Sequence, residues 1–286
     1  MTLDSITKIG ARLGNTALAV TAAAYSIATG RLIHVDSPAL VGALLGSATL
    51  FAYDLDHVRD TERSRRSPAQ RLRCWISSAV WVAIMLVTLE RYPFAPLCSA
   101  VFPLSVIVYA RPRQSGPQSL GLVRVKELPL VKPIFVALLW TLLPIEVSFF
   151  ASERPRAGVI AWATWILVAM TCAVTLCDFK DVDDDRTRAV KSWPIVLGSS
   201  RSLRWLHVAN VVGAVLLGAC VASRILPRSF LVFELLGALI AFCACVLARS
   251  HRSTRMTAFV AHVLVDLGLA VVAVTGAVVV HVFADI

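Results

Sequence analysis

The acidic residues of this chain concentrate in two short segments. Of its 18 aspartates and glutamates, half lie there: Asp54, Asp56, Asp60, Glu62, Asp178, Asp181, Asp183, Asp184 and Asp185. Helical spacing puts Asp56 and Asp60 on one face, and a second set on another: Asp178, Asp181 and Asp185. Clustered carboxylates at the end of an apolar helix repel each other and need a compensating cation. Mg²⁺ suits such a site, because it takes one or two carboxylates and completes its shell with water and phosphate oxygens.

The remaining acids of these segments have a simpler interpretation. Asp183, Asp184 and Glu62 lie off the two aligned faces. We interpret them as solvated loop acids that neighbouring arginines neutralise.

The elements that must position the aspartates are apolar helices. The chain of 286 residues is 57% hydrophobic and 16% charged, with a mean hydropathy of +0.74, which excludes a sizeable soluble domain. A membrane span needs ~20 apolar residues and must satisfy its own backbone hydrogen bonds, so each span is predicted to be a helix. The sequence predicts nine, at residues 12–29, 38–55, 74–90, 94–110, 133–150, 157–177, 203–223, 229–248 and 257–283.

The basic residues predict the orientation of these spans. Of the 28 lysines and arginines, 22 fall at the N-terminus and in alternate loops, and 6 fall in the other loops. This asymmetry is typical of a cytoplasmic N-terminus, with both aspartate segments on the cytoplasmic side. The net charge of +10 is therefore interpreted as membrane topology, and nucleic acid is not expected as a partner. We expect an integral protein of the cell inner (plasma) membrane, surrounded by lipid.

A weak internal repeat organises the chain. In each half an apolar helix runs into an Asp-x-x-x-Asp pair, at Asp56 and at Asp181, with a proline eight or nine residues after the pair, at Pro68 and at Pro194. The two segments are four helices apart, which predicts two four-helix halves plus a ninth helix in a single all-α domain over residues 1–286.

Three stretches resemble the UbiA superfamily of intramembrane prenyltransferases. DFKDVDDDRTRAVKSWPIVLG (Asp178 to Gly198) resembles the second aspartate-rich motif of that family, and LFAYDLDHVRDTERSRRSP (Leu50 to Pro68) is similar to the first. RVKELPLVKPIFVALLW (Arg124 to Trp140) is similar to the entry into the fifth helix. The likeness covers most of the chain, and the second motif is its specific part.

The resemblance implies that a prenyl diphosphate is bound through two Mg²⁺ ions between the motifs, with its tail in a cavity open to lipid. It assigns metal binding to five aspartates: Asp56, Asp60, Asp178, Asp181 and Asp185. It assigns diphosphate contacts to Lys132 and Lys191, with Arg12 and Arg66 as further candidates. For each of these four residues the alternative is a purely topological role beside a span.

The first motif departs from the family pattern. The family's asparagine falls on Ala52, which has no ligand atom, and Asp54 is the candidate to replace it as a metal ligand. Tyr109 and Trp140 are candidates to line the cavity, with an interfacial anchor as the alternative.

Three functions fit these residues. The first is a Mg²⁺-dependent transferase of alkyl or aryl groups other than methyl, which moves a prenyl group to an aromatic or other lipophilic acceptor. The second is a membrane terpene cyclase that shares the ionisation step, and the third is a non-enzymatic transporter or scaffold. Asp266 lies deep in the last span, where His262 is its expected partner, and it receives no catalytic role from the sequence.

Overall fold

The computed structural model describes residues 3–60, 67–109, 128, 130–150, 156–187, 190–249 and 254–283, and that part of the chain contains helices and no strand. The α-helices are α1 (Leu3–Leu32), α2 (Pro38–Asp60), α3 (Pro68–Leu89), α4 (Ala95–Ser99), α5 (Val101–Tyr109), α6 (Val131–Phe150), α7 (Ala157–Asp178), α8 (Val182–Thr187), α9 (Trp193–Val196), α10 (Ser199–Ala222), α11 (Glu234–Arg249), α12 (Thr254–Phe259) and α13 (Asp266–Phe283). A 3-10 segment, η2 (Arg228–Phe233), precedes α11, and a π-helical segment, η3 (Val260–Val265), joins α12 to α13.

Within the described residues, seven stretches of helix are long and apolar enough to cross a membrane. They are Pro38–Arg59, Pro68–Leu89, Val131–Phe150, Ala157–Asp178, Ser199–Ala222, Arg228–Arg249 and Met256–Phe283. The predicted all-helical class is therefore confirmed, whereas the predicted count of nine spans is supported for seven of them.

The first and fourth predicted spans differ from the other seven. Helix α1 is 30 residues long, but its first half carries Lys8, Arg12 and Asn15, which lower its apolar character. The fourth segment is shorter and divides into α4 and α5. Pro103 lacks the N–H that would bond to the Ser99 carbonyl, and α4 ends at Ser99.

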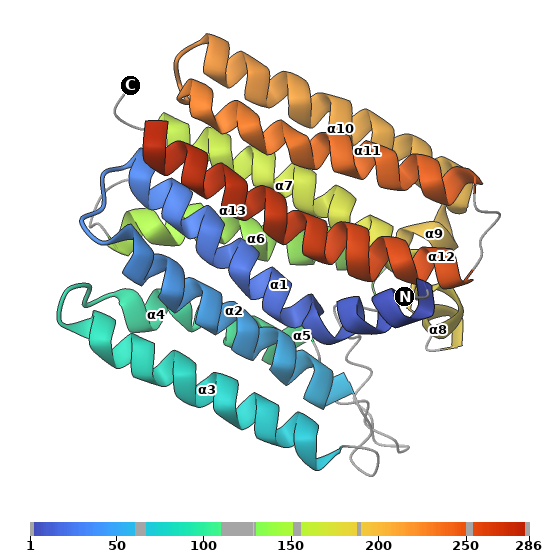
Figure 1. The fold of residues 1–286 in the computed structure, drawn as a ribbon, viewed down its shortest axis with the longest axis horizontal. Helices are drawn as coiled ribbons and strands as arrows, with labels where there is room; N and C mark the ends of the chain where they lie inside the picture. Colours follow the sequence, from blue (N-terminus) through green and yellow to red (C-terminus); the bar gives the residue numbers. More distant parts are fainter. Residues whose placement is uncertain are drawn as a thin grey trace.

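Helix α1 lies at the centre of the bundle, where it packs against α2, α6 and α13 (Figure 1). Two glycines of α2 allow a close approach to α1. A Cβ added at Gly42 would come within 2.6 Å of the Ile27 side chain, and one at Gly46 would come within 2.9 Å of the Ala19 carbonyl oxygen. Because these glycines carry no side chain, α1 and α2 pack closely in one register. This register determines which residues surround Asp54.

The packing order repeats along the chain. Helix α2 contacts α1, α3 and α5, and in the same way α7 contacts α6, α10 and α11. Each aspartate segment begins at the end of the corresponding helix, α2 or α7. The N-terminus, α8, α9 and α12 lie at one end of the bundle, and the C-terminus lies at the other (Figure 1).

An aromatic cluster fills the core near the start of α7. Its members are Tyr25, Trp140, Trp162, Trp165, Phe230 and Phe233. Tyr25 and Trp162 meet edge to face with ring centroids 5.4 Å apart, and Trp162 Nε1 donates to Thr29 Oγ1 at 3.2 Å. Aromatic pairs of this kind add about 0.5–1.5 kcal/mol each. Asp178 is at the opposite end of α7, so the aspartates sit on a firmly packed bundle.

Candidate functional site

A partly buried cation joins two aspartates of the second segment. Lys132, in the first turn of α6, places its Nζ 2.7 Å from Asp178 Oδ1 and 3.5 Å from Asp185 Oδ2. Asp178 is 1% exposed and Asp185 is 7% exposed. Burial raises the pKa of the Asp185 carboxyl, and the charge of Lys132 opposes this shift. The structure thus brings together three of the residues that the sequence singled out.

The start of α6 is tied to the segment that follows the second motif. The Leu130 amide donates to the Lys191 carbonyl oxygen at 3.2 Å, and Trp193 Nε1 donates to the Leu130 carbonyl oxygen at 3.0 Å. Leu130 has a φ of 63°, a left-handed conformation that these two bonds hold in place. They position Lys132, while the Lys191 side chain itself is exposed.

Lys180 is a second basic residue of the site, and sequence reasoning missed it. Its Nζ lies 3.7 Å from Asp181 Oδ2. Burial alone would lower the pKa of Lys180, but Cys177, Asp181 and Asp266 raise it above its ordinary value. The available signal was a lysine between two aligned aspartates, Asp178 and Asp181, in the motif itself.

The off-face acid of this segment is solvated. Asp183 has 89% of its side chain exposed and pairs with Arg186 Nη1 at 3.4 Å. This is the environment that we expected from its position. The side chain of Asp184 and the whole of Glu62 lie outside the described residues.

In the first segment, neighbouring helices hold Asp54. Asn15 Nδ2 of α1 donates to Asp54 Oδ1 at 2.8 Å, and Arg73 Nε of α3 lies 2.9 Å from the same oxygen. Asp54 Oδ2 is buried and accepts no hydrogen bond from a described residue. Sequence reasoning found neither Asn15 nor Arg73, and the signals were a polar residue in an apolar run and an arginine at the start of a span.

The structure describes only some of the other predicted residues of the first segment. Asp56 is half-buried, and the backbone of Asp60 ends α2. The side chains of Asp60 and Arg12, and the whole of Arg66, lie outside the described residues.

The Tyr53 hydroxyl of α2 lies near groups of α6, α7 and α13. Trp140 Nε1 of α6 donates to this oxygen at 3.3 Å. Asp56, Cys177 and Asp266 are all close enough to interact with it electrostatically. Trp140 is 1% exposed, so the alternative of an interfacial anchor is wrong for this residue. Its indole joins the interior to the helix that carries the first motif.

Tyr109 lies beside the second segment. Its ring stacks on Phe135 with centroids 5.3 Å apart and an interplanar angle of 6°, and its hydroxyl interacts electrostatically with Lys132. The side chain is half-buried. Its position next to the bridging lysine is compatible with the predicted contact to substrate.

The carboxylates of the second segment are the candidate ligands for Mg²⁺. Among the described residues, no three histidines, cysteines, aspartates or glutamates converge as a ready-made metal site. Asp178 Oδ2 is nevertheless buried and accepts no hydrogen bond from that part of the chain. A buried carboxylate oxygen without a donor is a hard anionic ligand of the kind that Mg²⁺ takes. The second segment thus offers one such oxygen, on Asp178.

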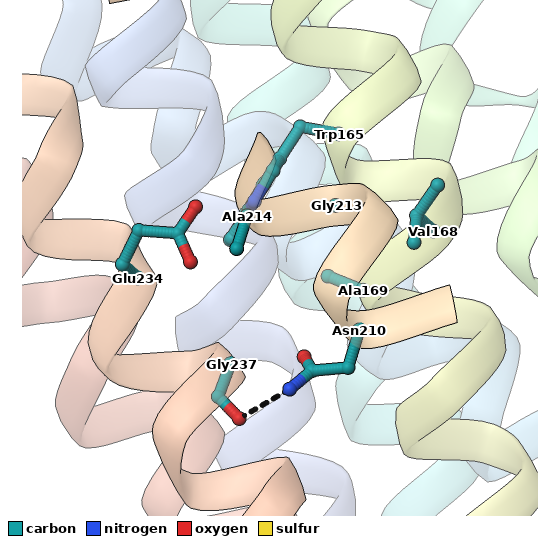
Figure 2. A pocket seen from close by; sticks show the side chains of 8 residues that line it. All are labelled: Trp165, Val168, Ala169, Asn210, Gly213, Ala214, Glu234 and Gly237. Atoms are coloured by element: carbon teal, nitrogen blue, oxygen red, sulfur yellow. Dashed lines mark hydrogen bonds between the residues drawn. The ribbon is translucent and has the colours of Figure 1, made fainter. Parts of the chain in front are cut away.

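A small pocket lies away from the aspartates. Figure 2 shows this pocket between α7, α10 and α11, lined by Trp165, Val168, Ala169, Asn210, Gly213, Ala214, Glu234 and Gly237. Asn210 Nδ2 crosses it to donate to the Gly237 carbonyl oxygen at 2.9 Å. Its volume of about 10 Å³ is at the limit for one water molecule. It is not the predicted prenyl cavity, which stays a prediction.

Comparison with known proteins defines the class. The model of the UbiA prenyltransferase family matches residues 17–270, so the chain belongs to that family and is an integral membrane protein. The resemblance found in the sequence is confirmed.

Two solved structures share the fold. An apo UbiA homologue from Aeropyrum pernix K1 is 14% identical with a TM-score of 0.65, and the match covers 91% of this chain and 97% of the other. A second structure was described for the biosynthesis of digeranylgeranylglyceryl phosphate synthase in membranes. It is 15% identical with a TM-score of 0.55, and the match covers 96% of this chain and 100% of the other. A comparison with curated proteins finds no match.

Proposed function

We propose that this protein transfers a prenyl group from a prenyl diphosphate to a lipophilic acceptor, with Mg²⁺ bound by the two aspartate segments. The observation that carries the proposal is the partly buried Lys132, which forms ion pairs with Asp178 and Asp185. Membership of the UbiA prenyltransferase family supports the reaction class.

The proposed ligands are Asp56 and Asp60 on one side, and Asp178, Asp181 and Asp185 on the other, with Asp54 as the replacement for the missing asparagine. Bound there, Mg²⁺ would stabilise the charge that develops on the departing diphosphate. Lys132 and Lys191 are proposed diphosphate contacts, with Arg12 and Arg66 as further candidates and Tyr109 beside the substrate.

The protein's own residues supply the other requirements of the reaction. Lys132 supplies a fixed positive charge, which costs no reorganisation when the leaving group becomes more negative. The apolar spans exclude water from the carbocation until the acceptor attacks it. The basic loops favour a cytoplasmic N-terminus and cytoplasmic aspartate segments, from which a soluble diphosphate headgroup can enter.

The direct test uses purified protein in nanodiscs. It is supplied with Mg²⁺ and a series of prenyl diphosphates, with and without a membrane-lipid extract, and products are measured by mass spectrometry. A product mass of acceptor plus prenyl group minus one proton supports the proposal. Cyclised hydrocarbon or alcohol from prenyl diphosphate alone would establish the cyclase instead, and no turnover with any prenyl diphosphate would leave the non-enzymatic role.

Binding supplies an independent readout. Inorganic diphosphate with Mg²⁺ is expected to raise the melting temperature of the wild-type protein, because a ligand that binds only the folded state stabilises it. Asp181→Ala is expected to remove this shift, whereas Asp183→Ala keeps it. Equal shifts in both variants would contradict the assignment of Asp181.

A further inference from the structure

Asp266 is an ionisable residue inside a membrane-spanning helix, and the proposed function gives it no part. It is 9% exposed and lies within the apolar stretch Met256–Phe283. It directly follows the π-helical segment η3. Charged groups are expensive in the hydrocarbon region, and π-helical turns are rare and concentrate at functional sites. Both features point to a role beyond packing.

Two side chains lie beside the carboxylate of Asp266. His262 Nδ1, one turn earlier, lies 3.5 Å from Oδ2, as the sequence led us to expect. Cys177 Sγ of α7 donates to Oδ1 at 3.9 Å. The Asp266 side chain keeps 13% of its surface accessible, so these contacts do not enclose it.

Helix α1 is shaped to accommodate this group. A Cβ at Gly14 would lie 3.1 Å from Asp266 Oδ2, and a Cβ at Gly10 would lie 2.7 Å from the His262 carbonyl oxygen. Two glycines one turn apart therefore let the backbone of α1 approach η3 and the start of α13 closely. The Asp266 carboxylate packs directly against the backbone of α1 at Gly14. A side chain at that position would displace the carboxylate.

Asp266 also lies beside the substrate site. It interacts electrostatically with the Tyr53 hydroxyl, as Asp56 does. Tyr53 is three residues before Asp56 on α2, which places it about 4.5 Å deeper into the membrane. Cys177, which touches Asp266, likewise precedes the ligand Asp178 on α7. Asp266 therefore lies near Tyr53 and Cys177, which both precede proposed ligands on helices that run toward the aspartate segments.

The reacting carbon of the prenyl diphosphate is expected at the depth of Asp266. With the diphosphate at the aspartates and the prenyl tail in the membrane, the carbon bonded to the diphosphate lies just inside the carboxylates. An acceptor must bring its nucleophilic atom to this point. A carboxylate there can only accept hydrogen bonds, so it selects an acceptor that offers a donor, such as a hydroxyl.

We propose that Asp266 takes the proton of the acceptor's hydroxyl group during prenyl transfer, and that His262 positions it; this inference rests on the proposed function. The bond between the prenyl carbon and the diphosphate oxygen breaks, and its electron pair leaves with the diphosphate. A lone pair of the acceptor oxygen forms the new bond to that carbon. The hydroxyl proton passes to the Asp266 carboxylate and afterwards to water.

The test separates diphosphate release from transfer. Wild-type protein and Asp266→Asn, in nanodiscs with Mg²⁺ and a series of radiolabelled prenyl diphosphates of different chain length, are assayed without acceptor, with a membrane-lipid extract, and with the same extract after acetylation of its hydroxyl groups. We expect the wild-type protein to prenylate only the untreated extract. Asp266→Asn should keep acceptor-independent diphosphate release within about twofold and lose transfer roughly 100-fold, the contribution of a general base.

Each outcome decides a different point. Equal losses of release and transfer in Asp266→Asn, or no loss of either, would overturn the inference and leave the proposed function standing. Transfer to the acetylated extract would overturn the hydroxyl chemistry. If the wild-type protein releases diphosphate from none of the prenyl diphosphates, with or without extract, the proposed function itself fails.

A second variant covers the case in which Asp266→Asn does not fold. Gly14→Ala leaves every charge in place but crowds Asp266 Oδ2, and a misplaced catalytic group is expected to cost roughly tenfold or more in transfer. Gly218→Ala is the matched control, because a Cβ there meets nothing within 4 Å. Gly14→Ala should lower transfer and spare diphosphate release, while Gly218→Ala changes neither. Identical behaviour of the two glycine variants would contradict the role of Asp266.

Discussion

Replacing Lys132 by methionine tests whether one buried ammonium holds the second aspartate segment together. Lys132 Nζ lies 2.7 Å from Asp178 Oδ1, and the exposed fractions of these side chains are 17% and 1%. Removing one partner of a buried ion pair leaves an uncompensated charge and costs about 3–5 kcal/mol. At roughly 2 °C per kcal/mol for a chain of this size, Lys132→Met should lower the melting temperature by roughly 6–10 °C.

The assay is thermal unfolding in detergent without Mg²⁺, so that only the protein's own cation acts on the carboxylates. Lys191→Met is the matched control, because this lysine is exposed and its backbone makes the contact to α6. Its melting temperature should change by no more than about 1 °C. Adding Asp178→Asn to Lys132→Met removes the stranded charge and should restore more than half of the lost stability. An unchanged melting temperature in Lys132→Met, or further destabilisation by Asp178→Asn, would refute the bridging role.

Three further predictions follow from the site. Asp181→Ala and Asp56→Ala should each abolish turnover by removing a proposed metal ligand, a loss of several kcal/mol in transition-state stabilisation. Asp183→Ala should have little effect. A larger effect of Asp183→Ala would show that the assignment of aspartates to helix faces is wrong. Asp54→Asn should keep turnover and Mg²⁺ dependence because an amide oxygen still accepts a hydrogen bond, while Asp54→Ala should weaken both; unchanged Mg²⁺ dependence in the alanine variant would limit Asp54 to holding α1 and α3. Reporter fusions in the loops after α2 and after α8 should both report the cytoplasm, and opposite sides would overturn the topology.

The sequence predicted the helices well where apolar character alone determines them. Seven long apolar stretches form helices that could span a membrane, because in lipid the backbone has no alternative partner for its hydrogen bonds. It predicted less well the two segments in which polar residues or prolines interrupt the pattern. The π-helical turn of η3 left no signal, since nothing in VAHVLV distinguishes it from an ordinary helix.

Helical spacing grouped Asp178, Asp181 and Asp185 as metal ligands, and this assignment stays a prediction. The structure shows that Asp178 and Asp185 share Lys132 and that the off-face Asp183 is solvated. Spacing could not reveal that Lys180 would fold back onto Asp181, because the chain leaves the helix between α7 and α8 and helical periodicity ends there.

Asp54 shows what only the packed structure can decide. From the sequence, its two carboxylate oxygens are equivalent, and Asp54 is a free replacement for the asparagine missing at Ala52. In the bundle, the close α1–α2 packing brings Asn15 to Oδ1, and α3 adds Arg73 to the same atom. A cation at this residue would therefore have to use Oδ2, which is buried and accepts no hydrogen bond from the described residues. The register of two helices, fixed by glycines 8 and 12 residues before Asp54, thus determines which carboxylate oxygen of Asp54 is available for chemistry.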